Sequence, residues 1–403
     1  MRALLAAALI GCSLVSFAQQ DVEDARRTIA SIEGLLQQRP TDATLWFFMS
    51  RFQAAAGDRA ASVKALERVE EFGEGFLPQR HDFTKVWGDT AFQEVRSRLE
   101  AKLPRLDYAP TAFTLEDRGL VPEGIAYDRP SRSFFVGSIA ERKVVRVGED
   151  GGVADFVAGP GLDAVLGLAV DAPRRLLYVV STNALTTEGR KQPRNAVFAY
   201  DIDSRRRVER YEIAGAQQLN DVAVAAGGRV FASDSASGAV YEIAVKGPGP
   251  SRELLKAGQV RGSNGLAASP DGRRLYIAHS TGLAVMDIAS GAVKRLENRT
   301  RESIAAIDGL YAWQGELIGV QNVTNPGRVI RIQLAADGDS ITGVRTLLSH
   351  HHNALDQPTT LAITDHGFFL LAATGVESFG ADGVIANPDT VPKPTVLRIP
   401  LPR

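Results

Sequence analysis

The N-terminal quarter of the chain has the spacing of amphipathic helices. Between residue 21 and about residue 105, apolar residues recur every three or four positions, which places them on one face of an α-helix. Pro40 ends the first run, Gly57 is placed to end the second, and Asp58 is placed to cap the third. We therefore predict an α-helical domain over residues 19–107.

Two interpretations of this helical domain remain open. Trp46 and the Ala-Gly-Asp turn at 56–58 resemble one unit of a tetratricopeptide array, in which helical hairpins bind a protein partner. A plain helical cap packed on the following domain would show the same periodicity. We describe the region as tetratricopeptide-like and expect that a protein partner could bind through it.

From about residue 110 the pattern alternates between apolar and polar positions, which is typical of β-strands. Six segments share the same succession of short apolar strands, and their first positions are 123, 166, 220, 264, 308 and 359. The mean spacing is about 47 residues, the length of a four-stranded propeller blade. We therefore predict a mainly β fold, a six-bladed β-propeller over residues 108–403.

The ring of blades needs a closing strand. The last repeat ends at its third strand, residues 395–401, so we expect residues 112–116 to supply the fourth strand of that blade. This pairing would leave no unpaired sheet edge. A parallel β-solenoid is the alternative fold, but about 47 residues is long for one of its coils.

Composition excludes several function classes. The chain has 403 residues, a formal net charge of -1 and 44% hydrophobic residues, so we expect a globular protein with no nucleic-acid partner. Its single cysteine is Cys12, which excludes disulfides, thiolate catalysis and cysteine-based metal sites from the rest of the chain.

The first residues are typical of an export signal. Arg2 is followed by an apolar run at 3–15, too short to span a bilayer, and then by Ser-Phe-Ala at 16–18. We predict a signal peptide over residues 1–18 and an exported protein, periplasmic or secreted, with no transmembrane segment. Leu-Ile-Gly-Cys at 9–12 also resembles a lipobox, so a lipid anchor on Cys12 is the alternative.

Oxygen-bearing side chains recur at the first position of the repeats. The six residues there are Glu123, Leu166, Asn220, Asn264, Asp308 and Thr359. Inner strands of a propeller line its channel and run the same way, so their starts converge at one face. Glu123, Asn220, Asn264 and Asp308 then form a site for a hard divalent cation, with Ca²⁺ favoured over Zn²⁺, Mg²⁺ or Mn²⁺. Asn-Gly and Asp-Gly are also common turn dipeptides, but one shared register argues against that interpretation.

The second strand of each blade should return to the same face, so its last residue should border the substrate pocket. These residues are Ser138, Ser181, Asp234, His279, Gln321 and Thr374. His279 is a candidate catalytic group, because an imidazole titrates near neutral pH and can relay a proton. We interpret the His350–His352 run as a solvated loop.

Four motifs in this order resemble the gluconolactonase family, which includes regucalcin, also called senescence marker protein. They are Pro-Glu-Gly at 122–124, Asn-Asp at 220–221, Ser-Asn-Gly-Leu with Ser-Pro-Asp-Gly within 263–272, and Ile-Asp-Gly-Leu at 307–310. The resemblance covers residues 120–400 and implies a six-bladed propeller with one divalent metal. It also implies metal ligation by Glu123, Asn264 and Asp308, with Asn220 near the metal or substrate, and lactone hydrolysis with Asp308 as base.

Two positions depart from the family pattern. Gln218 occupies a place where the family tends to have an arginine that contacts sugar hydroxyls, and His279-Ser280 replaces a usual Asp-Ser pair. Both departures argue against gluconolactone itself as substrate. We expect metal-assisted hydrolysis of some lactone or ester, in which Asp308 or His279 activates water. The alternative is a binding protein whose propeller holds a ligand without turning it over.

Overall fold

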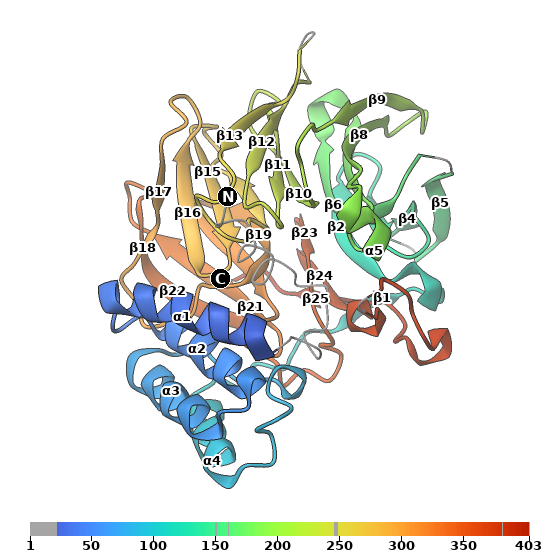
Figure 1. Ribbon diagram of the computed structural model, residues 1–403. Helices are drawn as coiled ribbons and strands as arrows, with labels where there is room; N and C mark the ends of the chain where they lie inside the picture. Colours follow the sequence, from blue (N-terminus) through green and yellow to red (C-terminus); the bar gives the residue numbers. More distant parts are fainter. Residues whose placement is uncertain (1–21, 150, 160, 246–248, 381, 403) are drawn as a thin grey trace.

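The computed structural model describes residues 22–149, 151–159, 161–245, 249–380 and 382–402. Over these residues the chain forms a helical segment followed by a six-bladed β-propeller, as predicted (Figure 1). The predicted signal peptide and Cys12 lie outside the described residues. No helix within the described part of the chain is long and apolar enough to cross a membrane.

The helical segment contains four α-helices whose ends follow from local chemistry. They are α1 (Val22–Gln38), α2 (Ala43–Ala56), α3 (Arg59–Phe72) and α4 (Thr90–Ala101). Asp42 caps α2 by accepting hydrogen bonds from Thr44 N and Leu45 N, at 3.0 and 3.2 Å. Gly57 ends α2 in the left-handed conformation, with φ of 88°, which a glycine adopts without strain.

The helical segment packs against the propeller. The side chain of Gln79 donates from Nε2 to Asn322 O at 2.8 Å and to Asn325 O at 3.1 Å, and Leu77 N donates to Thr324 O. Glu74 forms a β-bridge with Glu302. In Figure 1 the blue helices accordingly lie beside the orange blades. The segment therefore covers part of the propeller, as a helical cap does.

Each blade is built on four antiparallel strands, which follow sequence order from the channel outward in the first five blades, while the earliest strand of the domain is outermost in the sixth. Blades one to three are β2 (Pro122–Asp128), β3 (Ser133–Ser138), β4 (Lys143–Gly148), β5 (Val153–Ala158); β6 (Ala164–Asp171), β7 (Leu176–Thr182), β8 (Asn195–Asp201), β9 (Arg207–Glu212); and β10 (Leu219–Val224), β11 (Val230–Asp234), β12 (Val240–Ile243), β13 (Arg252–Leu255). Blades four to six are β14 (Leu266–Ala268), β15 (Arg274–His279), β16 (Gly282–Asp287), β17 (Val293–Arg295); β19 (Ile307–Trp313), β20 (Glu316–Gln321), β21 (Arg328–Leu334), β22 (Ser340–Leu348); and β23 (Leu361–Thr364), β24 (Gly367–Ala373), β25 (Thr395–Ile399), β1 (Thr111–Thr114).

Short elements lie between the helices and strands. They are β18 (Glu297–Asn298), which adds to β22, α5 (Thr187–Lys191), and the 3₁₀ turns η3 (Arg80–Asp82), η4 (Arg118–Leu120), η5 (Ala172–Arg174), η6 (Val376–Ser378) and η7 (Pro388–Thr390).

The propeller closes through its earliest strand, as expected. β1 pairs antiparallel with β25, so that Thr111 faces Leu397 and Phe113 faces Val396. The observed strand covers residues 111–114, slightly earlier than the predicted 112–116. Because β1 supplies the outer strand of the sixth blade, the start and end of the domain share one sheet.

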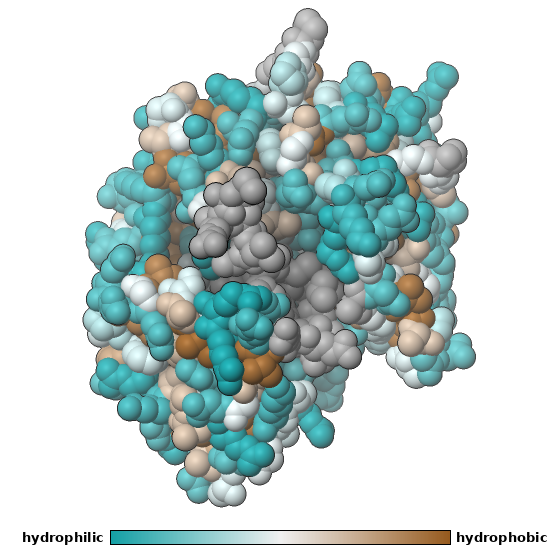
Figure 2. Space-filling view, in the orientation of Figure 1, coloured by the Kyte–Doolittle hydropathy of each residue, from teal (hydrophilic) through white to brown (hydrophobic). Residues whose placement is uncertain are grey.

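Apolar side chains fill the spaces between neighbouring blades. One cluster joins Phe135 and Phe156 of the first blade to Leu177 and Phe198 of the second, and all four side chains are buried. Burial of such faces is the main stabilising contribution to this architecture. On the face seen in Figure 2 hydrophobic residues appear only in small patches.

Candidate metal centre

β-bulges position the polar residues at the start of the inner strands. The pairing of the first and second strands shifts register between Pro122 and Ile125, between Leu219 and Val222, and between Ile307 and Leu310. Glu123, Asn220 and Asp308 lie within these bulges. A bulge bends its strand and re-aims the side chain, and bulges are frequent beside functional sites.

Glycines follow these residues for a reason other than turn formation. A Cβ atom on Gly265 would lie 2.5 Å from Asp308 O, and one on Gly124 would lie 2.2 Å from Leu166 O. Neither glycine has a positive φ. The turn interpretation of the Asn-Gly and Asp-Gly pairs is therefore wrong. These glycines allow the inner strands of adjacent blades to approach closely.

Two asparagines hold the carboxylate of Asp308. Asn264 donates from Nδ2 to Oδ1 at 2.7 Å, and Asn322 donates from Nδ2 to Oδ2 at 2.7 Å. Asp308 is buried, and this burial raises its pKa to about 6, although both amides oppose the shift. The structure therefore brings together Asn264 and Asp308, from adjacent blades, as predicted.

Glu123 is the carboxylate at the axis whose negative charge is least offset by neighbouring groups. Its side chain is 2% exposed, and its Oε2 atom has no hydrogen-bond partner among the described residues. Burial raises its pKa well above the usual range, and the nearby Asp308 and Asp221 carboxylates raise it further. The hydroxyls of Thr359 and Thr360 donate to the backbone oxygen of Glu123, at 2.8 and 2.6 Å, and hold this strand start in place.

Two amide oxygens are also left without partners. Asn220 donates from Nδ2 to Ser235 Oγ at 2.8 Å, while its buried Oδ1 accepts no hydrogen bond from the described residues. The Oδ1 atom of Asn322 is in the same condition. A buried acceptor without a donor is costly, and it is the expected state of an oxygen that binds a cation.

These observations fit a hard divalent cation. A positive ion with oxygen ligands would reduce the repulsion among the buried carboxylates. It would also bind the three oxygens that have no hydrogen-bond donor. No positively charged side chain in the described part of the chain lowers the pKa of Glu123. The residues present therefore fit the metal predicted from the sequence.

The sequence interpretation missed three residues near this centre. Asp221 accepts hydrogen bonds from Val222 N and from Leu266 N of the next blade, both at 2.8 Å, and burial raises its pKa to about 7. Asn322 and Tyr311 are the other two; burial raises the Tyr311 pKa well above the usual range, and the Asp221 carboxylate adds to that shift. Asp221 had a signal in the Asn-Asp motif, but only its first residue was assigned.

The residues that end the second strands hold loops and do not face a substrate. The Ser138 hydroxyl donates to Leu120 O, and Ser181 Oγ accepts from Asp163 N at 2.8 Å. Asp234 accepts from the backbone of Gln217, Gln218, Ala236 and Ser237, and Gln321 donates to Ser303 O and Ala305 O. Thr374 donates to Gln357 O. In each case the side chain fastens the loop before the inner strand of its own blade.

Side-chain alternation explains this difference from the prediction. Successive residues of a strand point to opposite sides, so the residue after each fastening position points the other way. Ser235, which follows Asp234, contacts Asn220, and Asn322, which follows Gln321, contacts Asp308. The predicted pocket residues therefore lie one position before the residues that contact Asn220 and Asp308. Gln218, the expected substrate contact, is 5% exposed within a fastened loop.

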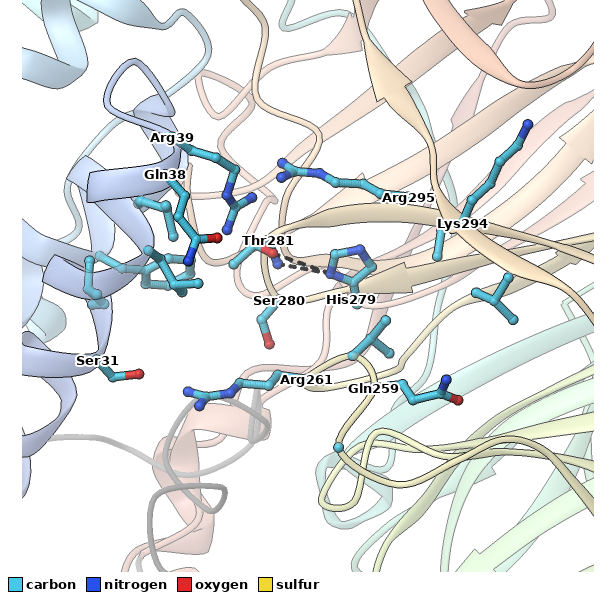
Figure 3. A pocket seen from close by; sticks show the side chains of 18 of the residues that line it. Ser31, Gln38, Arg39, Gln259, Arg261, His279, Ser280, Thr281, Lys294 and Arg295 are labelled. Carbon is cyan, nitrogen blue, oxygen red and sulfur yellow. Dashed lines mark hydrogen bonds between the residues drawn. The ribbon is translucent and has the colours of Figure 1, made fainter. Parts of the chain in front are cut away.

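His279 lies in a separate pocket. This cavity of about 510 Å³ is formed by α1, α2 and the fourth blade, and its lining includes Arg39, Arg261 and Arg295 (Figure 3). Thr281 N donates to His279 Nδ1 at 3.3 Å. Burial lowers the pKa of His279 to about 4, and Arg39 adds to the decrease. The imidazole is therefore neutral at physiological pH, and the expectation that it titrates near neutrality is wrong.

Comparisons with known proteins agree with the fold and the motifs. Residues 121–311 match the family described as SMP-30/Gluconolactonase/LRE-like region. No curated protein matches the chain significantly.

Several solved structures are similar to the chain in outline. A gluconolactonase from Xanthomonas campestris is 19% identical, with 73% of this chain and 91% of that chain covered and a TM-score of 0.46. Virginiamycin B lyase from Staphylococcus aureus is 12% identical over 65% and 81% of the two chains, with a TM-score of 0.48. A PQQ-bound aldose sugar dehydrogenase from Streptomyces coelicolor is 15% identical over 72% and 96%, with a TM-score of 0.48.

The sequence match begins at the first inner strand and extends into the fifth blade, so it includes Glu123, Asn220, Asn264 and Asp308. The helical segment lies outside it. Residues 121–311, slightly less than half of the chain, are thus similar in sequence to the SMP-30/gluconolactonase/LRE-like family.

Proposed function

We propose that the protein is a divalent-metal-dependent hydrolase that opens a lactone or a related ester. The observation that carries the proposal is the group of buried, unpaired oxygens around Glu123 and Asp308 at the axis of a domain that is similar in sequence to the gluconolactonase family. A binding protein would also tolerate a metal, but buried carboxylates with raised pKa values are typical of sites that move protons.

Oxygen donors determine the choice of ion. Glu123, Asn220, Asn264 and Asp308 would hold the cation, and their carboxylate and amide oxygens favour Ca²⁺. When bound, such an ion polarises the ester carbonyl and stabilises the developing oxyanion. Asn322, which is not among these ligands, retains an unpartnered Oδ1 to orient a ligand or a water molecule.

Asp308 is the proposed base. Asn264 and Asn322 donate to its two oxygens and so restrict the orientation of the carboxylate. A carboxylate positioned in this way can accept a proton from the attacking water and later return it to the leaving alkoxide. His279 takes no part in this scheme, because it lies in the pocket beside α1, and burial lowers its pKa to about 4, which makes it a weak base.

Activity measurements on the purified protein test the proposal. A panel of lactones and esters is incubated in excess Ca²⁺ or in EDTA, and the acid released is measured. We expect turnover in Ca²⁺ only, with Glu123→Gln lowering both Ca²⁺ affinity and rate. Asp389→Asn, which changes an exposed carboxylate, is the matched control. Ligand binding without turnover across the whole panel would favour the binding-protein alternative.

We also propose that the chain is exported after cleavage of residues 1–18. Sequencing the N-terminus of the protein purified from its native host should find Gln19. A lipidated Cys12 or an intact Met1 would contradict this proposal.

A further inference from the structure

A second cluster of metal-binding side chains lies where the helical segment meets the propeller. Glu100 is on the last turn of α4, and His350 and His351 are in the loop after β22. One donor atom from each of the three lies within 4.8 Å of the other two. The interpretation of the histidine run as a solvated loop is therefore wrong, since only 11% of the His350 side chain is exposed.

The His350 imidazole has a nitrogen atom that lacks a hydrogen-bond partner among the described residues. Its Nε2 atom is buried and makes no hydrogen bond within the described residues. Glu100 Oε1 lies 3.6 Å away, which is too far for a hydrogen bond. Two ligands of one tetrahedral zinc ion, each at about 2.0–2.2 Å from the metal, are separated by a similar distance.

Neighbouring groups orient the other two donors. Arg96 Nη1 binds Glu100 Oε2 at 2.8 Å, which leaves Oε1 directed to the histidine. Ser349 Oγ donates to Leu106 O at 3.1 Å and lies 3.0 Å from His351 Nδ1. When the hydroxyl hydrogen points to Leu106 O, His351 donates from Nδ1 to Ser349 Oγ and its Nε2 keeps a free lone pair. Such outer contacts are typical of metal-binding histidines.

We propose that Glu100, His350 and His351 form a second metal site, which binds a zinc-like transition ion. Two imidazoles and one carboxylate are a ligand set typical of Zn²⁺, with a fourth position left for water. The channel differs, because all of its donors are oxygens. Since Glu100 belongs to α4 and the histidines to the propeller, the ion would link the two parts of the chain.

Cobalt substitution tests this site in the full-length protein. The protein is saturated with Ca²⁺, titrated with Co²⁺, and followed by visible absorption, in which tetrahedral Co²⁺ gives intense bands. We expect one Co²⁺ equivalent that Zn²⁺ displaces. His350→Ala and Glu100→Gln should each weaken binding by at least about 10-fold. Glu123→Gln, in the channel, should leave the signal unchanged.

Matched controls separate ligation from general surface effects. Glu94→Gln changes an exposed carboxylate on the same helix, and His366→Ala removes an exposed histidine; both should bind Co²⁺ as the wild type does. If His350→Ala does not fold, His351→Gln replaces it. The proposal fails if the wild type gives no cobalt signal in excess Ca²⁺, or if the ligand variants bind as tightly as the controls.

Discussion

The channel centre and the pocket beside α1 are both polar, but their charges are opposite. Glu123 and Asp308 in the channel are buried, whereas Arg261 and Arg295 of the pocket are exposed. Glu123, Asp221 and Asp308 bring negative charge to the axis, and burial raises the pKa of each. The pocket contains Arg39 and Arg295, which share Asp42 as an ion-pair partner, at 3.0 and 3.3 Å.

The difference shows which region needs a ligand. In the pocket, Asp42 forms ion pairs with Arg39 and Arg295, Arg261 adds a further positive charge, and His279 stays neutral. At the axis, no protein cation offsets the pKa increase of Glu123 among the described residues. Burial without compensation is costly, so the axis gains most from a bound cation. We therefore assign the chemistry to the channel.

The largest expected effect tests Asp308 as the base. Asp308→Asn keeps the shape of the side chain but removes its ability to accept a proton, so we expect the rate constant kcat to fall by about 10²–10⁴-fold. Ca²⁺ affinity, measured by calorimetry, should fall by a much smaller factor. If kcat and Ca²⁺ affinity fell by the same factor, Asp308 would be a metal ligand and not the base.

The second prediction concerns the pocket and pH. The pKa of His279 is about 4 in the folded protein and about 6.5 in the unfolded chain, so the unfolded state binds more protons between these values. Stability should therefore fall as the pH decreases from about 6.5 to about 4, by up to about 3 kcal/mol. His279→Asn should flatten this dependence, measured by urea unfolding in excess Ca²⁺, whereas His366→Asn should not.

The third prediction tests the close approach of the inner strands. A methyl group on Gly265 would meet the backbone oxygen of Asp308, so Gly265→Ala should lower the free energy of unfolding by about 1–3 kcal/mol. Gly34 lies in α1 with no atom near its Cβ position, and Gly34→Ala should raise stability by up to about 1 kcal/mol. Similar effects of the two changes would contradict the packing argument.

The smallest expected effect concerns the contact between the helical segment and the channel loop. Gln79→Ala removes the hydrogen bonds to Asn322 O and Asn325 O, and we expect a loss of about 1–2 kcal/mol of stability. Because Asn322 also holds Asp308, we expect kcat to decrease as well. The loss of stability should stay close to the value expected for the lost hydrogen bonds. Gln93→Ala, which removes one hydrogen bond within the helical segment, should leave kcat unchanged.

What the sequence reveals depends on whether a feature repeats. Glu123, Asn264 and Asp308 could be predicted because each occupies the same place in its repeat, so one register identified them all. At the ends of the second strands, the predicted pocket residues lie one position before those that contact the axial groups. Alternation gives two candidate positions, and the sequence does not mark which one faces the axis.

Single contacts between distant segments leave no such pattern. Gln79 meets Asn322, and Glu100 meets His350, only because the helical segment lies on the fifth blade. No periodicity connects these residues, so the structure was needed to find them. The overall fold was predictable for the opposite reason, since its period is repeated six times.

Closure by β1 also has a consequence for the order of folding. Thr111 pairs with Leu397, so nearly the whole domain is synthesised before the sixth blade can be completed. Contacts this distant along the chain form slowly, because a long loop must be ordered first. During synthesis β1 has no partner until β25 is made, near the end of the domain. A late closure of this kind would keep the nascent chain unfolded long enough for the export proposed above.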